Sequence, residues 1–179
     1  MSEIGVAPWE RSGALVLCAG IDLGLSGAIA LIDASNERVF SVCPMPIVMR
    51  KVGKTNRKRL DYDGLWKLIG MCVDLGATMF CYEIPGAGFG AGGRELGEQV
   101  GAFRAFCHVA NVRTEQVTPG KWKQALQVPA DKKEACLRAE ILFPKDREKL
   151  RGERGGRADG KAEAAMIGLY GVRKYIRGG

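Results

Sequence analysis

The chain has 179 residues, 46% of them hydrophobic and 26% charged, which is the composition of one globular domain with a sizeable core. Lys and Arg number 27 against 20 Asp and Glu, and this excess favours a polyanionic partner, nucleic acid first. No apolar run reaches the length of a membrane span, and six cysteines without CxxC spacing beside one histidine argue against a zinc site. With no signal peptide at its start, we expect an intracellular protein with reduced thiols and no membrane partner.

Two buried strands joined by a glycine-rich turn are predicted first. The apolar runs at 14–19 and 28–32 flank this turn, and three glycines between residues 20 and 27 leave room for another group to approach the backbone. Asp22 lies at the end of the first strand. A buried carboxylate is costly unless it is paired or binds a metal, so Asp22 either caps the turn or is a metal-binding catalytic residue.

A long basic segment follows the third strand, which we expect at 38–43 in an antiparallel meander with the first two. Residues 44–59 show no periodicity and are predicted to be a loop. The loop has six cations near its end and no acid among them, so we expect it to contact phosphates, the alternative being a solvated basic loop. These cations are Arg50, Lys51, Lys54, Arg57, Lys58 and Arg59.

A second acid at a strand end is predicted in the middle of the chain. Apolar residues at helical spacing predict a helix over 61–75, and a short apolar strand at 78–82 then ends in Glu83. The glycine-rich segment 86–93 carries one aromatic residue, Phe89. Phe89 either stacks on nucleic-acid bases or folds under its own loop.

The helix predicted over 94–110 has two different faces. One is an apolar stripe that suits packing on a sheet, formed by Leu96, Val100, Phe103, Cys107 and Ala110. The other is a stripe of small residues at four-residue spacing, formed by Gly93, Gly97, Gly101 and Ala105. Glycine inside a helix costs about 1 kcal/mol against alanine, which implies close packing by another backbone. The small-residue stripe is therefore expected to contact a second subunit or the protein's own sheet.

The last third of the chain completes the fold. We expect a strand at 112–117, a helix start at 118–122, a helix from about 130 to 143, a mobile basic loop over 145–157 and a final helix beginning at Asp159. This order predicts an α/β protein. Its mixed five-stranded sheet has three antiparallel strands and then two parallel strands, and helices flank it. Residues 1–12 are predicted to be a loose arm and residues 13–179 a single domain.

Four carboxylates stand where this fold can bring them together. Asp22 and Glu83 end two strands, while Asp159 and Glu163 share one face of the last helix. If that face packs against the strand ends, the cluster repels itself unless cations fill it, and carboxylates suit Mg²⁺ or Mn²⁺. Two such ions about 3.5–4 Å apart can hydrolyse a phosphodiester without a histidine. The simpler alternative for Asp159 and Glu163 is an N-cap and a first-turn acid.

The same residues resemble a known family. Gly-Ile-Asp-Leu-Gly at 20–24, Glu83 and Asp-Gly-Lys-Ala-Glu-Ala at 159–164 are similar to the RuvC-type Holliday junction resolvases of the ribonuclease H-like superfamily. The nearer likeness is to the plant chloroplast resolvase and its phage relatives. That likeness is carried by the segments 26–31, 57–61, 118–123, 142–144 and 162–164. The resemblance covers about residues 17 to 173.

This resemblance implies a ribonuclease H-like fold and a homodimeric, Mg²⁺-dependent endonuclease that nicks four-way DNA junctions symmetrically. It implies that Asp22, Glu83, Asp159 and Glu163 bind two Mg²⁺ ions, with Mn²⁺ as a substitute. It places Lys132 near the active site, with Lys133 as the alternative. The last two acids are four residues apart here, as in the chloroplast pattern, which has histidine where Asp159 stands, whereas bacterial RuvC proteins space them by three.

We expect DNA contacts from cations in three regions and from one aromatic residue. Besides the six cations of segment 44–59, the expected DNA-binding residues are Phe89, Lys121, Lys123, Arg151, Arg154 and Arg157. The resemblance implies a cytoplasmic or nucleoid-associated protein, and a phage-encoded or organellar origin is compatible with it.

Two other functions compete with the nuclease. A non-catalytic branched-DNA-binding protein is the main alternative, but four acids in a DNA groove repel phosphates unless metal is present. Gly-Ile-Asp-Leu-Gly also opens actin-like ATPases, where it contacts the nucleotide phosphate. That fold needs two such domains and a longer chain.

Overall fold

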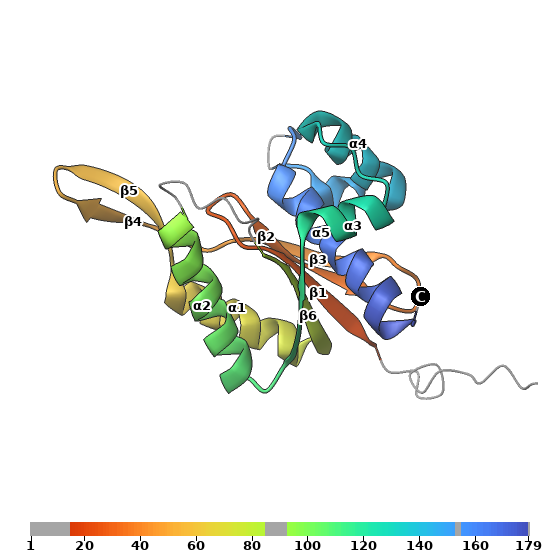
Figure 1. The fold of residues 1–179 in the computed structure, drawn as a ribbon, viewed down its shortest axis with the longest axis horizontal. Helices are drawn as coiled ribbons and strands as arrows, with labels where there is room; N and C mark the ends of the chain where they lie inside the picture. Colours follow the sequence, from red (N-terminus) through yellow and green to blue (C-terminus); the bar gives the residue numbers. More distant parts are fainter. Residues whose placement is uncertain (1–14, 85–92, 153–154, 179) are drawn as a thin grey trace, which may run out of the picture.

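A mixed five-stranded sheet forms the centre of the computed structural model, which describes residues 15–84, 93–152 and 155–178 (Figure 1). Its strands are β1 (Leu17–Asp22), β2 (Ala28–Asp33), β3 (Val39–Pro44), β6 (Ala77–Glu83) and β7 (Arg113–Val117), in the spatial order β3-β2-β1-β6-β7. β1 pairs antiparallel with β2, and β2 with β3, whereas β6 is parallel to both β1 and β7. The predicted ribonuclease H-like α/β fold, with three antiparallel strands and then two parallel strands, is confirmed.

Helices cover both faces of this sheet (Figure 1). On one face lie α1 (Tyr62–Asp74) and α2 (Gly93–Val109), and on the other α3 (Pro119–Ala125), α4 (Lys132–Leu142) and α5 (Asp159–Gly171), with the short helices η1 (Arg147–Leu150) and η2 (Val172–Ile176). Successive side chains of β1 point to opposite faces of the sheet. Helices cover both faces, so β1 is buried on both sides. Leu17, Ala19 and Ile21 pack with α1 and α2, and Cys18 packs with α5. No helix in the described ranges is long and apolar enough to cross a bilayer.

α5 lies directly on the backbone of β1. A Cβ atom added at Gly20 would overlap the Ala164 carbonyl oxygen and the Gly168 nitrogen, and one added at Gly160 would overlap the Ser26 carbonyl oxygen. The predicted close approach at Gly20 is therefore made by the protein's own helix. It brings the first turn of α5 against the turn that follows β1.

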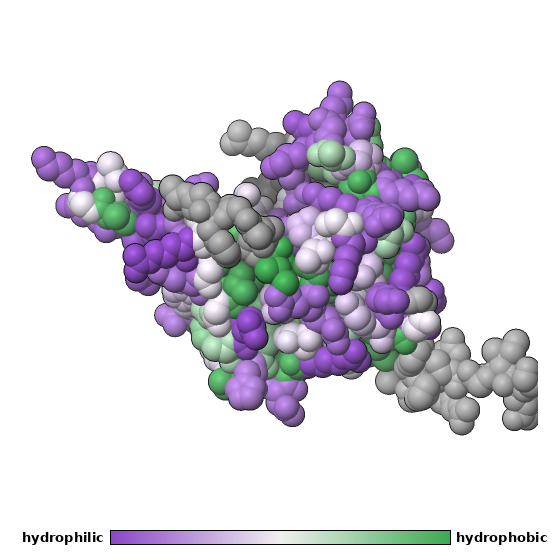
Figure 2. All heavy atoms as spheres, in the orientation of Figure 1, coloured by the Kyte–Doolittle hydropathy of each residue, from purple (hydrophilic) through white to green (hydrophobic). Residues whose placement is uncertain are grey.

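The predicted loop at 44–59 is wrong, because the structure has a β-hairpin there, formed by β4 (Ile47–Val52) and β5 (Thr55–Leu60). Gly53, the first of the two loop residues, has φ 62°, which favours glycine. The hairpin projects from the body (Figure 1), and hydrophilic residues cover most of it (Figure 2). Most of its side chains are exposed on both faces, so the sequence lacks the alternation that marks a half-buried strand.

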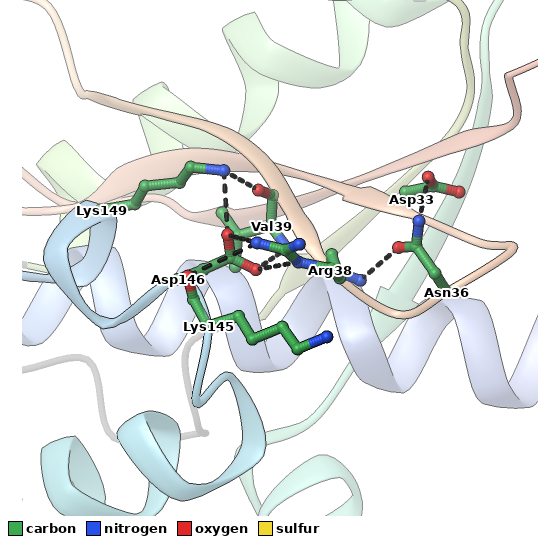
Figure 3. A network of polar contacts seen from close by, with 7 residues as sticks. All are labelled: Asp33, Asn36, Arg38, Val39, Lys145, Asp146 and Lys149. Carbon is green, nitrogen blue, oxygen red and sulfur yellow. Dashed lines mark hydrogen bonds and ion pairs between the residues drawn. The ribbon is translucent and has the colours of Figure 1, made fainter.

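The prediction of a mobile loop at 145–157 is wrong for its first half, which includes η1 and is anchored to β3 (Figure 3). The buried Asp146 carboxylate accepts hydrogen bonds from the Arg38 guanidinium at 2.8 and 3.1 Å, from Lys149 Nζ at 3.0 Å and from the Val39 amide at 3.1 Å. These donors, Arg38 first, hold the pKa of Asp146 at about 2. Charged residues of the segment that the sequence predicts to be a mobile basic loop thus fix its first half to β3.

Gly20→Ala is expected to lower the free energy of unfolding by about 3 kcal/mol, because two backbones must separate to admit the methyl group. Chemical denaturation with a circular dichroism readout measures the effect. The matched control is Gly70→Ala in α1, where an added Cβ meets nothing within 4 Å of the described residues. The free energy of unfolding of that variant is expected to rise by up to about 1 kcal/mol, because alanine has a higher helix propensity than glycine. Equal stability of the two variants would contradict a tight contact between α5 and β1.

Candidate active site

Two carboxylates stand at one edge of the sheet because neighbouring parallel strands end together. Asp22 is the last residue of β1 and Glu83 the last of β6. The strands are in register up to the pair Ile21 and Tyr82, immediately before these acids. The topology therefore places Asp22 beside Glu83, at the edge where α5 begins.

α5 contributes the other two acids, and a cleft opens between them and Asp22. Asp159 is the first residue of α5, and Glu163 follows one turn later on the same face. The cleft has a volume of about 530 Å³. Its lining residues are Asp22, Ser26, Lys132, Arg157, Ala158, Asp159, Gly160 and Glu163. Glu83 is not among them.

The carboxylates of Asp22, Glu83 and Glu163 act on one another electrostatically. Burial, with repulsion from Glu163 and then Glu83, raises the pKa of Asp22 to about 7, against the opposing effect of Lys132 and Lys123. Burial also raises the pKa of Glu83, which a hydrogen bond from Trp122 partly offsets. The Asp22 carboxylate forms no hydrogen bond or ion pair within the described part of the chain. Its charge is therefore the one in this cluster that most needs a cation.

Two consecutive residues of α3 hold two of the acids. The buried Trp122 donates from Nε1 to Glu83 Oε2 at 2.6 Å. Lys123 Nζ lies 3.5 Å from Glu163 Oε1 and 5.1 Å from the centre of the Trp122 ring. Lys123, expected to contact DNA, is thus placed within the acid cluster instead. The sequence places Trp122 in the helix start at 118–122 and in the segment 118–123 that carries the family resemblance, but nothing in it identifies Glu83 as its partner.

Asp159 has partners from α4. Lys132 Nζ lies 3.9 Å from Asp159 Oδ2, and the Cys136 thiol donates to Asp159 Oδ1 at 3.4 Å. Of the two lysines considered from the sequence, Lys132 lines the cleft and Lys133 does not. Cys136 carries no sequence signal for this contact, because it lies in a helix far from Asp159 in the chain.

The residues expected to bind DNA are spread over several surfaces. Arg157 lines the cleft, and Lys121 is exposed on α3. Arg151 forms ion pairs with Glu140 at 3.1 Å and Glu148 at 3.3 Å, so its charge is used within the protein. The six cations of segment 44–59 lie in the projecting hairpin. Phe89 and Arg154 fall outside the described residues.

The donor set suits a hard divalent cation, because carboxylate oxygens around a half-buried, unpaired Asp22 carboxylate are the ligands that Mg²⁺ and Mn²⁺ prefer. As the side chains lie, however, no three His, Cys, Asp or Glu residues in the described ranges are arranged to hold one ion. Three of the four acids are instead in contact with Trp122, Lys123 and Lys132. The chemistry of the site fits a metal, and the side chains would have to reorient to bind it.

The sheet order and the helices on both faces define a ribonuclease H-like fold with acids at two adjacent strand ends. This is the fold of RuvC from Thermus thermophilus. The structure of that protein in complex with a Holliday junction substrate has a TM-score of 0.62, with 16% identity over 91% of this chain and 96% of that one. A second structure of the same RuvC has a TM-score of 0.54, with 17% identity over 90% and 96%. No protein-family model and no curated protein matches the sequence.

Replacing Glu163 by glutamine is expected to lower the pKa of Asp22 from about 7, because it removes the larger of the two carboxylate repulsions. Because the folded-state pKa of Asp22 lies above its ordinary value of 3.8, the free energy of unfolding falls as pH rises from about 3.8 through about 7. The Glu163→Gln variant should show a smaller fall over the same pH range. Carboxyl ¹³C NMR titration of the metal-free protein measures the midpoint.

The control for this titration is Glu148→Gln, a change of the same kind at an exposed side chain in η1. An Asp22 midpoint that is unchanged by Glu163→Gln, or shifted equally by Glu148→Gln, would contradict the described acid cluster.

Proposed function

We propose that the protein is a structure-selective DNA endonuclease that resolves four-way junctions by metal-dependent hydrolysis. The observation that carries this proposal is a half-buried Asp22 carboxylate that is repelled by Glu163 and Glu83 and lies beside an open cleft. The formal net charge of +7 favours a polyanionic substrate. The RuvC-like fold supports the choice of a branched DNA, as does the resemblance to the plant chloroplast and phage resolvases.

Asp22, Glu83, Glu163 and Asp159 would hold two Mg²⁺ ions, and Mn²⁺ could replace them. When bound, such ions activate water and stabilise the leaving oxygen. The other residues of the site position the carboxylates and the substrate and neutralise their charges. Trp122 fixes the Glu83 carboxylate through a part-buried hydrogen bond, and Lys123 supplies the counter-charge of Glu163. Lys132 at the cleft wall can donate hydrogen bonds to a phosphate oxygen, and Arg157 can orient the sugar–phosphate backbone.

A non-catalytic branched-DNA-binding protein is the alternative function, and the acids weigh against it. In the absence of metal, the carboxylates that line this cleft repel the phosphates that a binding groove must attract. An actin-like ATPase is weaker still, because one ribonuclease H-like sheet accounts for the strands that the structure describes, apart from the separate hairpin.

Paired cutting of two strands of a junction requires two active sites, which a homodimer supplies. α2 offers a surface for such a homodimer. The apolar stripe of α2 packs on the sheet, with Phe103 and Cys107 fully buried. A Cβ added at Gly97 or Gly101 would meet no described residue within 4 Å. The alternative that these glycines pack on the protein's own sheet is therefore wrong. We propose that their face contacts a second copy across a two-fold axis.

Asp22→Asn, Glu83→Gln and Glu163→Gln are each expected to abolish metal-dependent cleavage and to keep junction binding. Each removes ligand charge without removing a cation, and a loss of about 4 kcal/mol corresponds to about a thousandfold slower cleavage. Single-turnover nicking of a synthetic four-way junction measures the rate. Near wild-type nicking by Asp22→Asn would sink the proposal.

Two lysines supply a matched comparison in the same assay. Lys132→Ala should slow nicking and leave binding intact, while Lys133→Ala should change neither. Equal rates for the two variants would remove Lys132 from the site.

Gly97→Leu is expected to overpack the proposed subunit contact, so that sedimentation shifts from dimer towards monomer while each subunit stays folded. Paired cutting of a junction should then fall more than single nicking, since one subunit makes one cut. The control is Gly120→Leu in α3, where an added Cβ also meets no described residue within 4 Å. A Gly97→Leu protein that sediments as the unchanged dimer, or that unfolds, would show that this face of α2 is not the subunit contact.

A further inference from the structure

The β4–β5 hairpin places arginines opposite one another on one face. Cross-strand partners of an antiparallel pair point to the same side, and the register sets Arg50 directly opposite Arg57. Arg59 is two residues from Arg57 and shares its face. All three line a cleft of about 510 Å³ between the hairpin and the first two turns of α2. We refer to Arg50, Arg57 and Arg59 as the arginine face.

The charge of this cleft is only partly compensated within the protein. Arg59 forms an ion pair with Glu95, and Arg94 lies 3.4 Å from Glu98, so both acids that line the cleft have a partner. No acid of the described residues forms an ion pair with Arg50, Lys51 or Arg57. Like charges directly opposite each other in a strand pair are destabilising. The hairpin therefore gains stability if an anion lies between Arg50 and Arg57.

The hairpin has no evident structural task that would require this charge. Most of its side chains are exposed, and it forms a two-stranded sheet apart from the central one. It projects beside the N-terminal end of α2 (Figure 1). No residue that lines this cleft also lines the acid cleft at α5. The arginine face is thus a separate site with its own geometry.

We propose that the arginine face binds the sugar–phosphate backbone of a DNA duplex arm, away from the cleavage site. This inference rests on the proposed function for its choice of DNA. Guanidinium groups bind phosphate oxygens in pairs and suit a fixed phosphate contact better than lysine does. A two-stranded ribbon also has the width to lie along a DNA groove. The hairpin then holds an arm of the substrate while the acids act on a strand near the junction.

The test compares two double variants that remove the same charge from the same hairpin. Arg50→Ala/Arg57→Ala removes the opposed pair from the cleft. Lys54→Ala/Lys58→Ala removes two cations that do not line it. Affinity for a linear DNA duplex is measured against salt, with a chelator present so that no cleavage occurs. The arginine variant should reduce the slope of log affinity against log salt by about 2, one for each phosphate contact. The lysine variant should reduce it by less than about 1.

Two outcomes would overturn the proposal. An unchanged slope in the arginine variant would show that the hairpin does not bind the duplex. An equal or greater loss in the lysine variant would show that only diffuse charge matters. If the alanine variant fails to fold, Arg50→Lys/Arg57→Lys keeps the charge and removes the paired donors. Weaker binding by that variant supports the arginine face, whereas wild-type binding overturns it.

The same variants separate this site from the cleavage site and from other polyanions. Junctions with long and short arms should be bound differently by the wild type but equally by the arginine variant. If the protein cleaves no junction and the arginine pair still sets duplex affinity, the nuclease proposal fails and this one stands. Tighter binding to vesicles of anionic lipid than to duplex, lost with the same two arginines, would overturn the choice of DNA.

Discussion

The position of the site depends on one backbone contact, in which α5 meets β1 at Gly20 with no side chain between the two backbones. Gly20 faces Ala164 and Gly168, and Gly160 faces the turn at Ser26. Interaxial distances grow with the size of the side chains at a contact, so these small residues let the helix come as close as backbone atoms allow. Because Asp159 and Glu163 begin this helix, its height above the sheet sets their distance from Asp22. A looser contact would leave the same acids in the sequence and no cluster in space.

The acids form an electrostatically strained cluster that the protein stabilises only in part. Three of the four have a donor or a cation as partner, from α3 or α4. The Asp22 carboxylate has none in the described part of the chain, and desolvation together with repulsion from Glu163 and Glu83 raises its pKa to about 7. Structural ion-pair networks can also perturb pKa values. What distinguishes this cluster is that its unpaired charge faces an open cleft rather than a packed core.

The sequence predicted β1, β2 and β6 well, because these strands are short apolar runs bounded by glycine, proline or charged residues. It also placed Asp22 and Glu83 at strand ends, since both acids directly follow such runs. The hairpin was missed because β4 and β5 are exposed on both faces and carry no alternation. The hydrogen-bond partners of the acids could not be predicted from the sequence for a different reason. Trp122 to Glu83, and Cys136 to Asp159, are contacts between segments whose meeting depends on how α3 and α4 dock, which no local pattern encodes.

The two contacts that α3 makes with the acids differ in how strongly dissolved salt affects them. Trp122 holds Glu83 with a neutral donor that is fully buried, so this hydrogen bond, itself part-buried, does not depend on a paired charge. Lys123 holds Glu163 through an ion pair whose lysine side chain is about one-third exposed, and such a pair weakens as the salt concentration rises. One carboxylate is thus fixed by the fold, while the other answers to the ionic composition of the surroundings. The site therefore combines a carboxylate held by a neutral donor, Glu83, with one held by a salt-sensitive ion pair, Glu163. Neighbouring residues of a single seven-residue helix make both contacts.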